Sequence, residues 1–597
     1  MRVWSVINDR LSLAHRFLIR QAKRLSDRQL MVIVAVVVGV VSALAAYVFE
    51  WIVEEIRKWL SQLVGADSVN ILYFIMPVVG IVLVTLFVKY VVKDNINHGV
   101  TRVLYAITHS GSKLKGHNTY SSIVAGATTI GFGGSVGPEA PMVMTGAAVG
   151  SNIGRFFRMN YRNTTILLGC GAAAGLAAIF KAPIAGVIFV MEVLMLNVSL
   201  FSVIPILIAA VTSTTIIYLL NGFEPVFSVG YGDTILLIDD MPYYILLGLF
   251  CGLVSYYLIA SSGYIERSFK KMSKQYKKWI VGGSMLGLLI FLLPPLYGQG
   301  YNIITLLIDR DTDTLFNNTL FYSLRDSVWV LLAYLAAIIC FKSIAMACTN
   351  AAGGVGGAFA PSLFSGAFAG YFFATLLNSL FGLDLPVVSF VLVGMAGVMS
   401  GAMNSPLTAV FLIAEITGGY SLFVPLMLVA AMSFAICYYF TPFSVYTRDL
   451  VMKGDVTALS SERSMLFIDL NKLVEEDFST VHEEMTLGDM VEAVSTSRRN
   501  IFPVVDEARH LVGVVTLDDI RGDMFDRSLY DRNHVSDYMT TPPETVTADD
   551  PVGDVLEKFD RSGAWNLPVL TSDGRYRGFV SKSKIFSEYR SGLAANS

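Results

Sequence analysis

Charged side chains are scarce in this sequence, and their scarcity excludes an ordinary soluble enzyme of this size. Asp, Glu, Lys and Arg make up 15% of the 597 residues, whereas hydrophobic residues make up 54% and the mean hydropathy is +0.59. Such a composition is typical of an integral membrane protein. The charge is also uneven, because 26 of the 47 acidic residues fall after residue 450. We therefore predict a membrane body followed by a soluble tail.

Cysteine is also rare, and its spacing excludes a disulfide framework. The five cysteines all lie in the apolar body without a CxxC pair, so we interpret them as packing residues. The sequence also lacks a Walker loop, a catalytic triad and a cluster of metal ligands. We therefore expect neither an enzyme nor a bound metal nor a required cofactor.

The amino-terminal stretch is basic. The first 29 residues contain seven Lys or Arg but two Asp, and no small-residue cleavage site precedes the apolar run that begins at Leu30. This stretch is therefore not a removed signal peptide, and we expect residues 1–29 to form a basic amphipathic helix. A second basic cluster lies between Arg267 and Lys278. The positive-inside rule then places the amino terminus and the tail on the cytoplasmic side of the inner (plasma) membrane.

Glycine, in contrast, is concentrated in two runs that are similar to each other. Residues 133–141 read GGSVGPEAP and residues 353–361 read GGVGGAFAP, so that Glu139 has its counterpart in Phe359. Both runs interrupt apolar segments, and irregular backbone at membrane depth is stable only where it is buried in protein or lines a polar cavity. The two runs therefore predict a transport pathway.

A second pair of segments indicates that the membrane body is duplicated. Pro183 is followed nine residues later by Glu192, and Pro406 by Glu415. Both pairs of motifs recur at an offset of about 220 residues, which favours an internal repeat. We expect the halves at about 30–225 and 240–450, with the pathway at their interface. Because Glu192 and Glu415 occupy matched positions, we favour a structural role for them over a role in transport.

The breaks themselves favour an anion as the transported ion. A helix that begins midway through the membrane directs unpaired N–H groups and a positive dipole end at the cavity, which attracts anions without a fixed cation. Few Lys or Arg lie in the body. A cation carrier would need several pore carboxylates to replace the water shell of the ion, and the broken helices carry one, Glu139.

These motifs resemble those of the CLC family of chloride channels and proton-coupled chloride transporters, over nearly the whole chain. The family pattern Gly-Lys/Arg-Glu-Gly-Pro corresponds to residues 137–141, Gly-x-Phe-x-Pro corresponds to residues 357–361, and Gly394 to Gly418 is similar to the late helix pair of the family. The resemblance implies an all-α membrane domain with broken and tilted helices in an inverted repeat. It also implies a homodimer with one anion pathway per subunit.

The resemblance implies roles for particular residues. Glu139 would be the gating glutamate, whose carboxylate competes with chloride and yields when it is protonated or displaced; the alternative is a carboxylate that only caps a helix. The implied anion-binding residues are His98, Gly99, Val100, Gly137, Pro138, Ala140, Gly357, Ala358, Phe359, Ala360 and Tyr446.

Three positions depart from the family pattern. His98 stands where the family has an anion-ligating serine, and it either donates to the anion, with a charge that changes near neutral pH, or caps a helix with its ring turned away. Val193 stands where many proton-coupled members have a second glutamate, which favours passive, channel-like conduction over chloride/proton exchange. Pro138 replaces a basic residue, and we assign that change no function.

The tail resembles a tandem pair of CBS motifs, which are small α/β units. We expect a linker at 451–471, the first motif at 472–530 and the second at 535–590. Such motifs often bind adenine nucleotides (ATP, ADP or AMP), and the first copy offers a helix N-terminus for phosphate. The predicted nucleotide-binding residues are Thr480, Val481, Phe502, Pro503, Thr516 and Asp519. The alternative is that the pair serves only dimerisation.

We therefore expect passive transport of chloride or a similar small anion through a CLC-type protein, gated by Glu139 and modulated by cytoplasmic CBS domains. The alternatives are a proton-coupled chloride antiporter and, more remotely, a CBS-regulated cation transporter.

Overall fold

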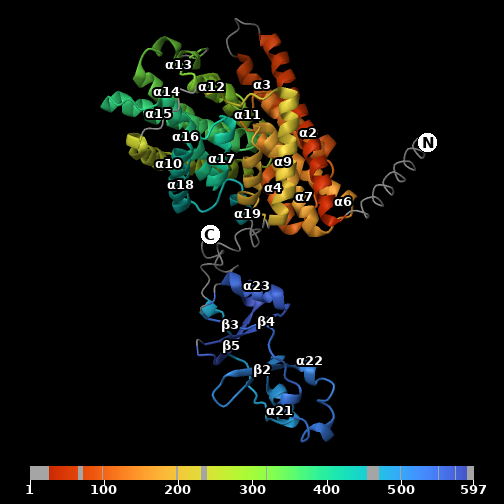
Figure 1. The fold of residues 1–597 in the computed structure, drawn as a ribbon. Coiled ribbons are helices and arrows are strands. Elements are labelled where there is room, and N and C mark those ends of the chain that lie inside the picture. The colour runs from red at the N-terminus through yellow and green to blue at the C-terminus, as the bar shows by residue number, and fades with distance from the viewer. Residues whose placement is uncertain are drawn as a thin grey trace, which may run out of the picture. The chain divides into compact units, whose positions relative to one another are not determined.

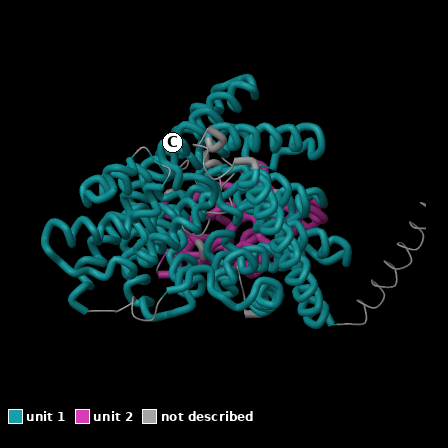
Figure 2. Tube along the Cα trace, turned by 90° about the horizontal axis from the view of Figure 1, so that it is seen from above, with its two compact units in different colours: residues 1–451 teal, residues 452–597 magenta. Residues whose placement is uncertain are grey.

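The computed structural model describes residues 26–64, 71–96, 98–196, 200–229, 238–317, 319, 321–452, 470–497, 499–548, 550, 552–571, 573–585 and 587. The chain divides into two compact units, unit 1 over residues 1–451 and unit 2 over residues 452–597 (Figure 2). The helix expected at 1–29 lies almost entirely outside the described residues, as does most of the linker expected at 451–471.

Helices make up unit 1 (Figure 1). Apolar segments in lipid form helices because a helix satisfies the backbone hydrogen bonds within the segment. The helices are α2 (Asp27–Val64), α3 (Ile71–Phe87) with its π-helical continuation η1 (Val88–Val92), α4 (Gly99–His109), α5 (Asn118–Gly131), α6 (Glu139–Phe156), α7 (Tyr161–Phe180), α8 (Pro183–Glu192), α9 (Leu200–Asn221), α10 (Met241–Lys270), α11 (Gln275–Leu292), α12 (Tyr301–Ile308), α13 (Thr312–Leu315), α14 (Val328–Ala352), α15 (Phe359–Phe381), α16 (Val387–Met403), α17 (Pro406–Ile416), α18 (Phe423–Phe440) and α19 (Arg448–Met452).

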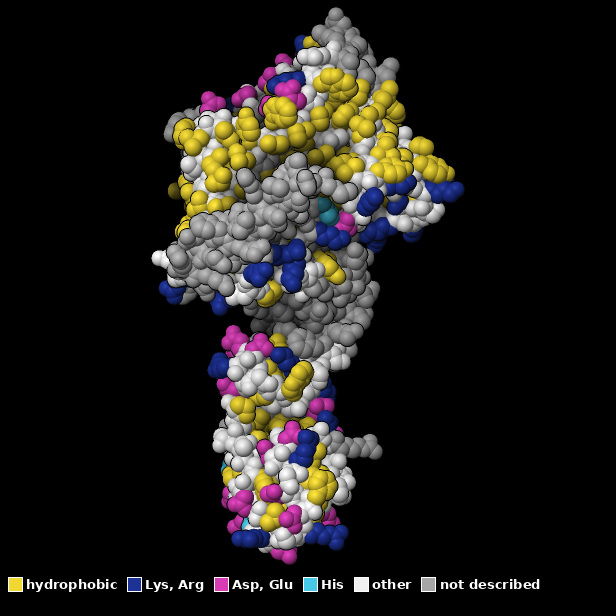
Figure 3. Space-filling model, turned by 90° about the vertical axis from the view of Figure 1, so that its right-hand side faces the viewer, with side chains coloured by type: hydrophobic (Ala, Val, Ile, Leu, Met, Phe, Trp, Pro, Cys, Tyr) yellow, Lys and Arg dark blue, Asp and Glu magenta, His cyan; other side chains and the backbone are white. Residues whose placement is uncertain are grey.

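Unit 1 has the length and the surface of a membrane domain. Eight of the described helices are long and apolar enough to cross a membrane, whereas α8, α16 and α17 are apolar but shorter. Figure 3 shows hydrophobic side chains gathered in a broad band over unit 1, with Lys and Arg side chains along one margin. The predicted membrane body of complete and broken helices is confirmed.

The two halves of unit 1 are inverted relative to each other. The equivalent helices α8 and α17 exchange contacts end to end: Glu192, the last residue of α8, binds the first turn of α17, and Glu415, near the end of α17, binds the first turn of α8. Two helices that reach each other's opposite ends run antiparallel. The inverted repeat that the family resemblance implies is therefore present.

Unit 2 contains two similar α/β halves. In the first, β1 (Ile501–Val505) and β2 (Leu511–Thr516) form an antiparallel pair beside α21 (Leu487–Thr496) and α22 (Leu517–Ile520). In the second, β3 (Val546–Thr547) pairs in parallel with β4 (Asn566–Leu570), which pairs antiparallel with β5 (Tyr576–Ser581), and α23 (Val552–Ser562) accompanies them. Each half has a separate cluster of buried apolar residues.

Candidate functional site

Two loops, one from each half, meet inside unit 1. The Gly137 N–H donates to the carbonyl oxygen of Gly357 (N to O 3.0 Å), and the Gly357 N–H donates back to Gly137 (2.9 Å). Gly133 (φ 96°) and Gly353 (φ 117°) open these loops in the left-handed region, where glycine is favoured because it has no Cβ. As a result, α6 and α15 begin inside the protein, with their N-termini on opposite sides of one short ladder.

Glu139 is the first residue of α6, and its side chain reaches across to α15. The carboxyl group is fully buried (0% exposed), and its Oε1 atom accepts a hydrogen bond from the Phe359 N–H at 2.7 Å. Its Oε2 atom is buried without a hydrogen-bond partner. A Cβ atom at Gly137 or Gly357 would overlap the carboxyl group, so a side chain at either position would displace Glu139 from its present place. The carboxylate thus binds at a helix N-terminus, a position that also suits a free anion.

A third helix begins at the same place. Gly99, the first residue of α4, lies so close to α6 that a Cβ on it would approach the carbonyl oxygen of Ala140 to 2.6 Å. Val100 is buried beside it. His98 is the N-cap residue of α4 in the left-handed conformation (φ 57°), its ring makes no capping hydrogen bond, and its side chain is exposed. The backbone at Gly99 therefore faces the α6 N-terminus. The His98 ring does not cap the N–H groups of α4.

Tyr446 completes this group. Its hydroxyl group is buried without a hydrogen-bond partner, and its carbonyl oxygen accepts a hydrogen bond from the Thr101 hydroxyl of α4 at 3.0 Å. The remaining predicted anion-binding residues are also at the helix starts: Pro138 and Ala358 are the N-cap residues of α6 and α15, and Ala360 is buried in the first turn of α15.

The acids at the ends of α8 and α17 have different surroundings from Glu139. Glu192 accepts from the N–H groups of Leu407 (Oε1, 3.1 Å) and Thr408 (Oε2, 2.8 Å). Glu415 accepts from the N–H groups of Ile184 (Oε1, 3.0 Å) and Ala185 (Oε2, 2.8 Å). Each carboxylate caps the helix of the other half, as the matched positions predict for a structural role.

Val193 follows Glu192 as the C-cap residue of α8 and is 4% exposed. An apolar side chain therefore occupies the position of the inner acid in proton-coupled members of the family. No group of three or more His, Cys, Asp or Glu that could hold a metal ion occurs among the residues that the structure describes.

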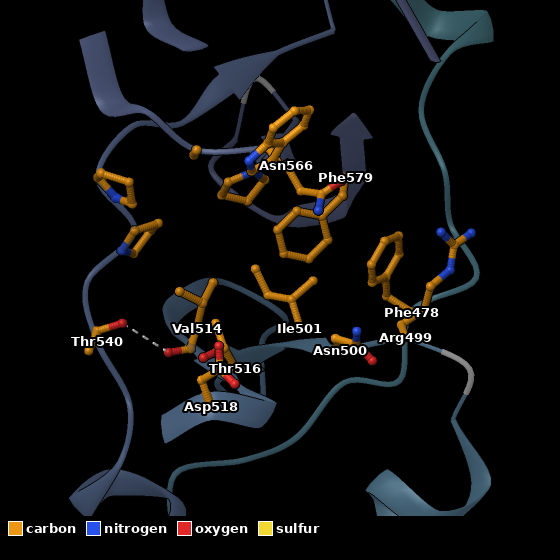
Figure 4. A pocket seen from close by; sticks show the side chains of 15 residues that line it. Phe478, Arg499, Asn500, Ile501, Val514, Thr516, Asp518, Thr540, Asn566 and Phe579 are labelled. Atoms are coloured by element: carbon orange, nitrogen blue, oxygen red, sulfur yellow. Dashed lines mark hydrogen bonds between the residues drawn. The ribbon is translucent and has the colours of Figure 1, made fainter. Parts of the chain in front are cut away.

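Unit 2 contains a pocket of about 600 Å³ between its two halves (Figure 4). Thr516 and Asp518 lie on one side, and Asn566 and Phe579 lie on the opposite side. Trp565, which is 74% exposed, also lines it. Polar groups and flat apolar side chains thus face one another across a space that fits a small organic ligand.

Of the residues predicted to bind a nucleotide, the structure brings Thr516 into this pocket. Phe502 and Val481 are fully buried in the core of the first half, and Pro503 is buried in β1. Asp519 is exposed and caps α22, with its Oδ2 atom accepting from the N–H and the hydroxyl group of Thr516 (both 2.7 Å). Thr480 is half-buried outside the pocket lining.

The pocket also contains residues that the motif comparison missed. The Arg499 guanidinium lies 2.6 Å from Asp477 and 3.4 Å from Glu475, and it stacks on the Phe478 ring at 4.6 Å. The charge of Arg499 on Asp477, through their hydrogen bond, lowers the pKa of that carboxyl group. No sequence motif marks Arg499 and Phe478, which lie in two loops on either side of α21 in the chain.

Comparison with known proteins gives consistent matches. The sequence profile described as "Voltage gated chloride channel" matches residues 80–438, and that of the CBS domain matches residues 470–525 and 535–591. The chain is 27% identical over 445 residues to a putative chloride channel protein ClcB-like of Ralstonia nicotianae, which covers 72% of this chain and 98% of that protein. It is 30% identical over 314 residues to the H(+)/Cl(−) exchange transporter ClcA of Vibrio cholerae, covering 51% of this chain and 63% of that one. A solved structure of a slow cyanobacterial Cl−/H+ antiporter is 22% identical and covers 72% of this chain and 98% of that one, with a TM-score of 0.61.

Proposed function

The chain belongs to the voltage gated chloride channel family, and we propose that its CLC-type chloride transport is gated by Glu139 and coupled to protons. One observation carries the gating assignment. The Glu139 carboxylate accepts a hydrogen bond from the N-terminus of α15 at 2.7 Å, and its second oxygen has no partner. A negative group held by backbone N–H groups competes with an anion for the same donors, and protonation removes its charge.

Proton coupling is favoured by the named activity of the relatives. The Vibrio cholerae relative is an H(+)/Cl(−) exchange transporter, and the cyanobacterial structure is that of a Cl−/H+ antiporter. Passive conduction is the second candidate, and Val193 favours it because this apolar side chain cannot carry a proton. Under the first candidate, the proton crosses the inner half of unit 1 without an acid at this position.

Flux from purified protein in liposomes tests both candidates. With an outward chloride gradient and no proton gradient, coupled exchange drives protons inward at a fixed ratio to chloride, and the internal pH falls. Passive conduction moves chloride without protons. Its flux stops when the membrane potential that it builds up balances the chloride gradient. Absence of any chloride flux from well-folded protein would contradict CLC-type transport itself.

For unit 2 we propose an adenine nucleotide regulator. The pocket between the two halves offers Thr516 for phosphate or ribose and Trp565 for stacking on a base. Calorimetry on the full chain with ATP, ADP and AMP tests this, and chloride flux with and without the bound nucleotide tests regulation. Absence of heat and of a thermal shift with all three would leave the alternative that the pair serves only dimerisation.

We also propose a homodimer in the plasma membrane, with the amino terminus and unit 2 in the cytoplasm. Family membership supports the dimer. The basic residues at the end of α10 and in the turn that follows it support the orientation. Light scattering of the protein in detergent measures the oligomeric state. Labelling a cysteine introduced into unit 2, with the protein in sealed vesicles, measures the orientation.

A further inference from the structure

Two cations of unit 1 lie beside the same glycine. The Lys342 ammonium, on α14, donates a hydrogen bond to the carbonyl oxygen of Gly298 (Nζ to O 3.1 Å). The Nη2 atom of Arg57, on α2, lies 3.1 Å from the position that a Cβ of Gly298 would occupy. From the bond lengths within one residue, the two charged groups are no more than roughly 11 Å apart. Positive charge from two helices therefore converges on one turn.

Neither cation forms an ion pair with a carboxylate in the part of the chain that the structure describes. Lys342 is fully buried (0% exposed), with its ammonium 4.4 Å from the centre of the Phe364 ring. The Nε atom of Arg57 is buried without a hydrogen-bond partner. Glu54, one turn earlier on α2, lies 3.9 Å from Lys58 instead. A buried cation in an apolar body is costly unless a negative partner neutralises it.

The turn at Gly298 is hydrogen-bonded to the loop that precedes Glu139. The Gly298 N–H donates to the carbonyl oxygen of Gly133 at 3.2 Å, and the Ser135 hydroxyl donates to the carbonyl oxygen of Leu296 at 2.7 Å. Gly133 and Ser135 belong to the loop between α5 and α6, which ends at Glu139. A ligand beside Gly298 is therefore separated from Glu139 by one loop.

The position of Arg57 along α2 indicates on which side of the membrane the turn at Gly298 lies. Arg57 lies near the end of α2 that is remote from the amino terminus, and its side chain is half-buried. The turn at Gly298 therefore lies toward the face of the membrane opposite the amino terminus, which is the external face in the proposed orientation.

We propose that Arg57 and Lys342 form a second anion site at Gly298, which takes a small monovalent anion such as chloride or bromide. The guanidinium and the ammonium supply charge-assisted hydrogen bonds to the anion. The inference rests on the proposed transport function, because the site concentrates external anion next to the loop that positions Glu139. It differs from the site at the α4, α6 and α15 N-termini, which is built from backbone groups.

Chloride flux in liposomes tests this site when external and internal chloride are varied separately. We expect Lys342→Met to raise the half-saturating external chloride concentration roughly tenfold, Arg57→Gln to raise it by less, and both to leave the internal dependence unchanged. Lys342→Arg keeps the charge and restores a value near that of the unchanged protein. Lys58→Gln is the matched control, since this exposed lysine lies one residue from Arg57 and pairs with Glu54 and Glu55.

The outcomes distinguish an anion site from a purely structural role, in which Arg57 and Lys342 only hold the turn at Gly298 in place. If both Lys342→Met and Arg57→Gln lose flux but keep the half-saturating external chloride concentration, the proposed anion site is wrong. A purely structural role changes the rate of transport and not the affinity for external chloride. If Lys342→Met does not give monodisperse protein, Arg57→Gln decides alone. Failure of the unchanged protein to move chloride would contradict the transport function. In that case anomalous scattering from crystals soaked in bromide still decides the site: a bromide peak between the two side chains supports it, and no peak overturns it.

Discussion

Two kinds of carboxylate sit on helix N-termini in unit 1. At the ends of α8 and α17, Glu192 and Glu415 each use both oxygens, with hydrogen bonds of 2.8 to 3.1 Å to backbone N–H groups. At the start of α15, Glu139 uses one oxygen, and the other is buried without a partner. The first kind occurs twice and is reciprocal between the halves, whereas Phe359 replaces the acid in the second half.

The difference distinguishes a structural carboxylate, which stays in place, from a gating carboxylate, which can be displaced. A carboxylate with both oxygens bonded loses two hydrogen bonds when it leaves, and it leaves the N–H groups of the other helix unpaired. A carboxylate with an unpartnered buried oxygen already carries a desolvation cost, so protonation or exchange with an anion relieves it. The same interaction with a helix N-terminus thus serves a fixed contact in one place and an exchangeable contact in another.

The largest expected effect comes from removing the charge at the gate. We expect the chloride flux of the unchanged protein to rise as the pH falls, because the neutral acid binds the α15 N-terminus less strongly than the carboxylate does. Glu139→Gln is permanently neutral, so we expect its flux at pH 7.5 to rise about tenfold or more and its pH dependence to disappear. Flux measured from pH 4.5 to 7.5 in liposomes checks this.

Glu139→Asp serves as the control, because it keeps the charge and therefore keeps a pH-dependent flux. If Glu139→Gln has the flux and pH profile of the unchanged protein, the carboxylate is a cap of the first kind and the comparison fails.

The next effect concerns the two reciprocal caps. Glu415→Gln replaces one acceptor oxygen with an amide NH2 group and leaves one N–H group in the first turn of α8 without a partner. We expect this change to lower the free energy of unfolding by about 2 kcal/mol and to leave the pH dependence of flux unchanged. Glu192→Gln should have a similar cost because its contacts mirror those of Glu415. Denaturation in detergent followed by fluorescence measures the cost, and a pH profile altered by either variant would show that these acids take part in transport.

A smaller effect is expected at a carboxylate held by side-chain cations outside the membrane spans. Asp94 lies 3.0 Å from Lys115, 3.1 Å from the Nε2 atom of His117 and 3.4 Å from Arg102. Burial raises the pKa of Asp94, but the hydrogen bond from Lys115 and the charge of Arg102 outweigh it and hold the pKa at about 2. Because this value lies below the unfolded one, Asp94 stabilises the fold above about pH 4 and loses that effect as the pH falls toward 2.

Asp94→Asn should therefore lower the free energy of unfolding by about 1 kcal/mol at pH 7, after allowance for solvent screening, and by less at pH 3. Thermal unfolding at the two pH values checks this, with Lys113→Gln as an exposed control. An equal loss at both pH values would mean that the charge of Asp94 contributes nothing.

The smallest effect is expected in unit 2, where two acids occupy the same local structure. Asp489 and Asp519 each accept two hydrogen bonds on one oxygen from a threonine three residues earlier, Thr486 and Thr516. Asp519 lies next to Asp518, which lines the pocket, whereas Asp489 has no neighbour in the chain that does so. We expect Asp519→Asn to weaken adenine nucleotide binding about fivefold, and Asp489→Asn to leave it unchanged while costing similar stability. Equal binding by both variants in calorimetry would remove Asp519 from the nucleotide site.

The sequence alone predicts the centre of unit 1 well. Paired glycines, matched prolines and the exchange of Glu139 for Phe359 are visible because they recur at one offset. The capping role of Glu192 and Glu415 is also predictable, since matched acids at helix ends favour a shared structural role. The direction of the repeat is not visible in the residues, because an internal duplication looks the same whether its halves are parallel or inverted.

Other features depend on packing, which a motif does not encode. Arg57 and Lys342 are far apart in the sequence, and Gly298 between them has no distinctive neighbours, so their convergence appears only in the folded chain. In unit 2, Phe502 and Val481 match motif positions, but both side chains face the core of the first half. The pocket is instead formed between the halves, by residues that no single motif contains.

The ladder between Gly137 and Gly357 consists of two hydrogen bonds of nearly equal length that run in opposite directions. Such a ladder looks the same when it is viewed from either face of the membrane. The backbone at the crossing therefore carries no information about inside and outside. The two faces of the crossing differ in the side chains attached to it, Glu139 on one half and Phe359 on the other, so that a single pair of positions makes a symmetric backbone crossing asymmetric.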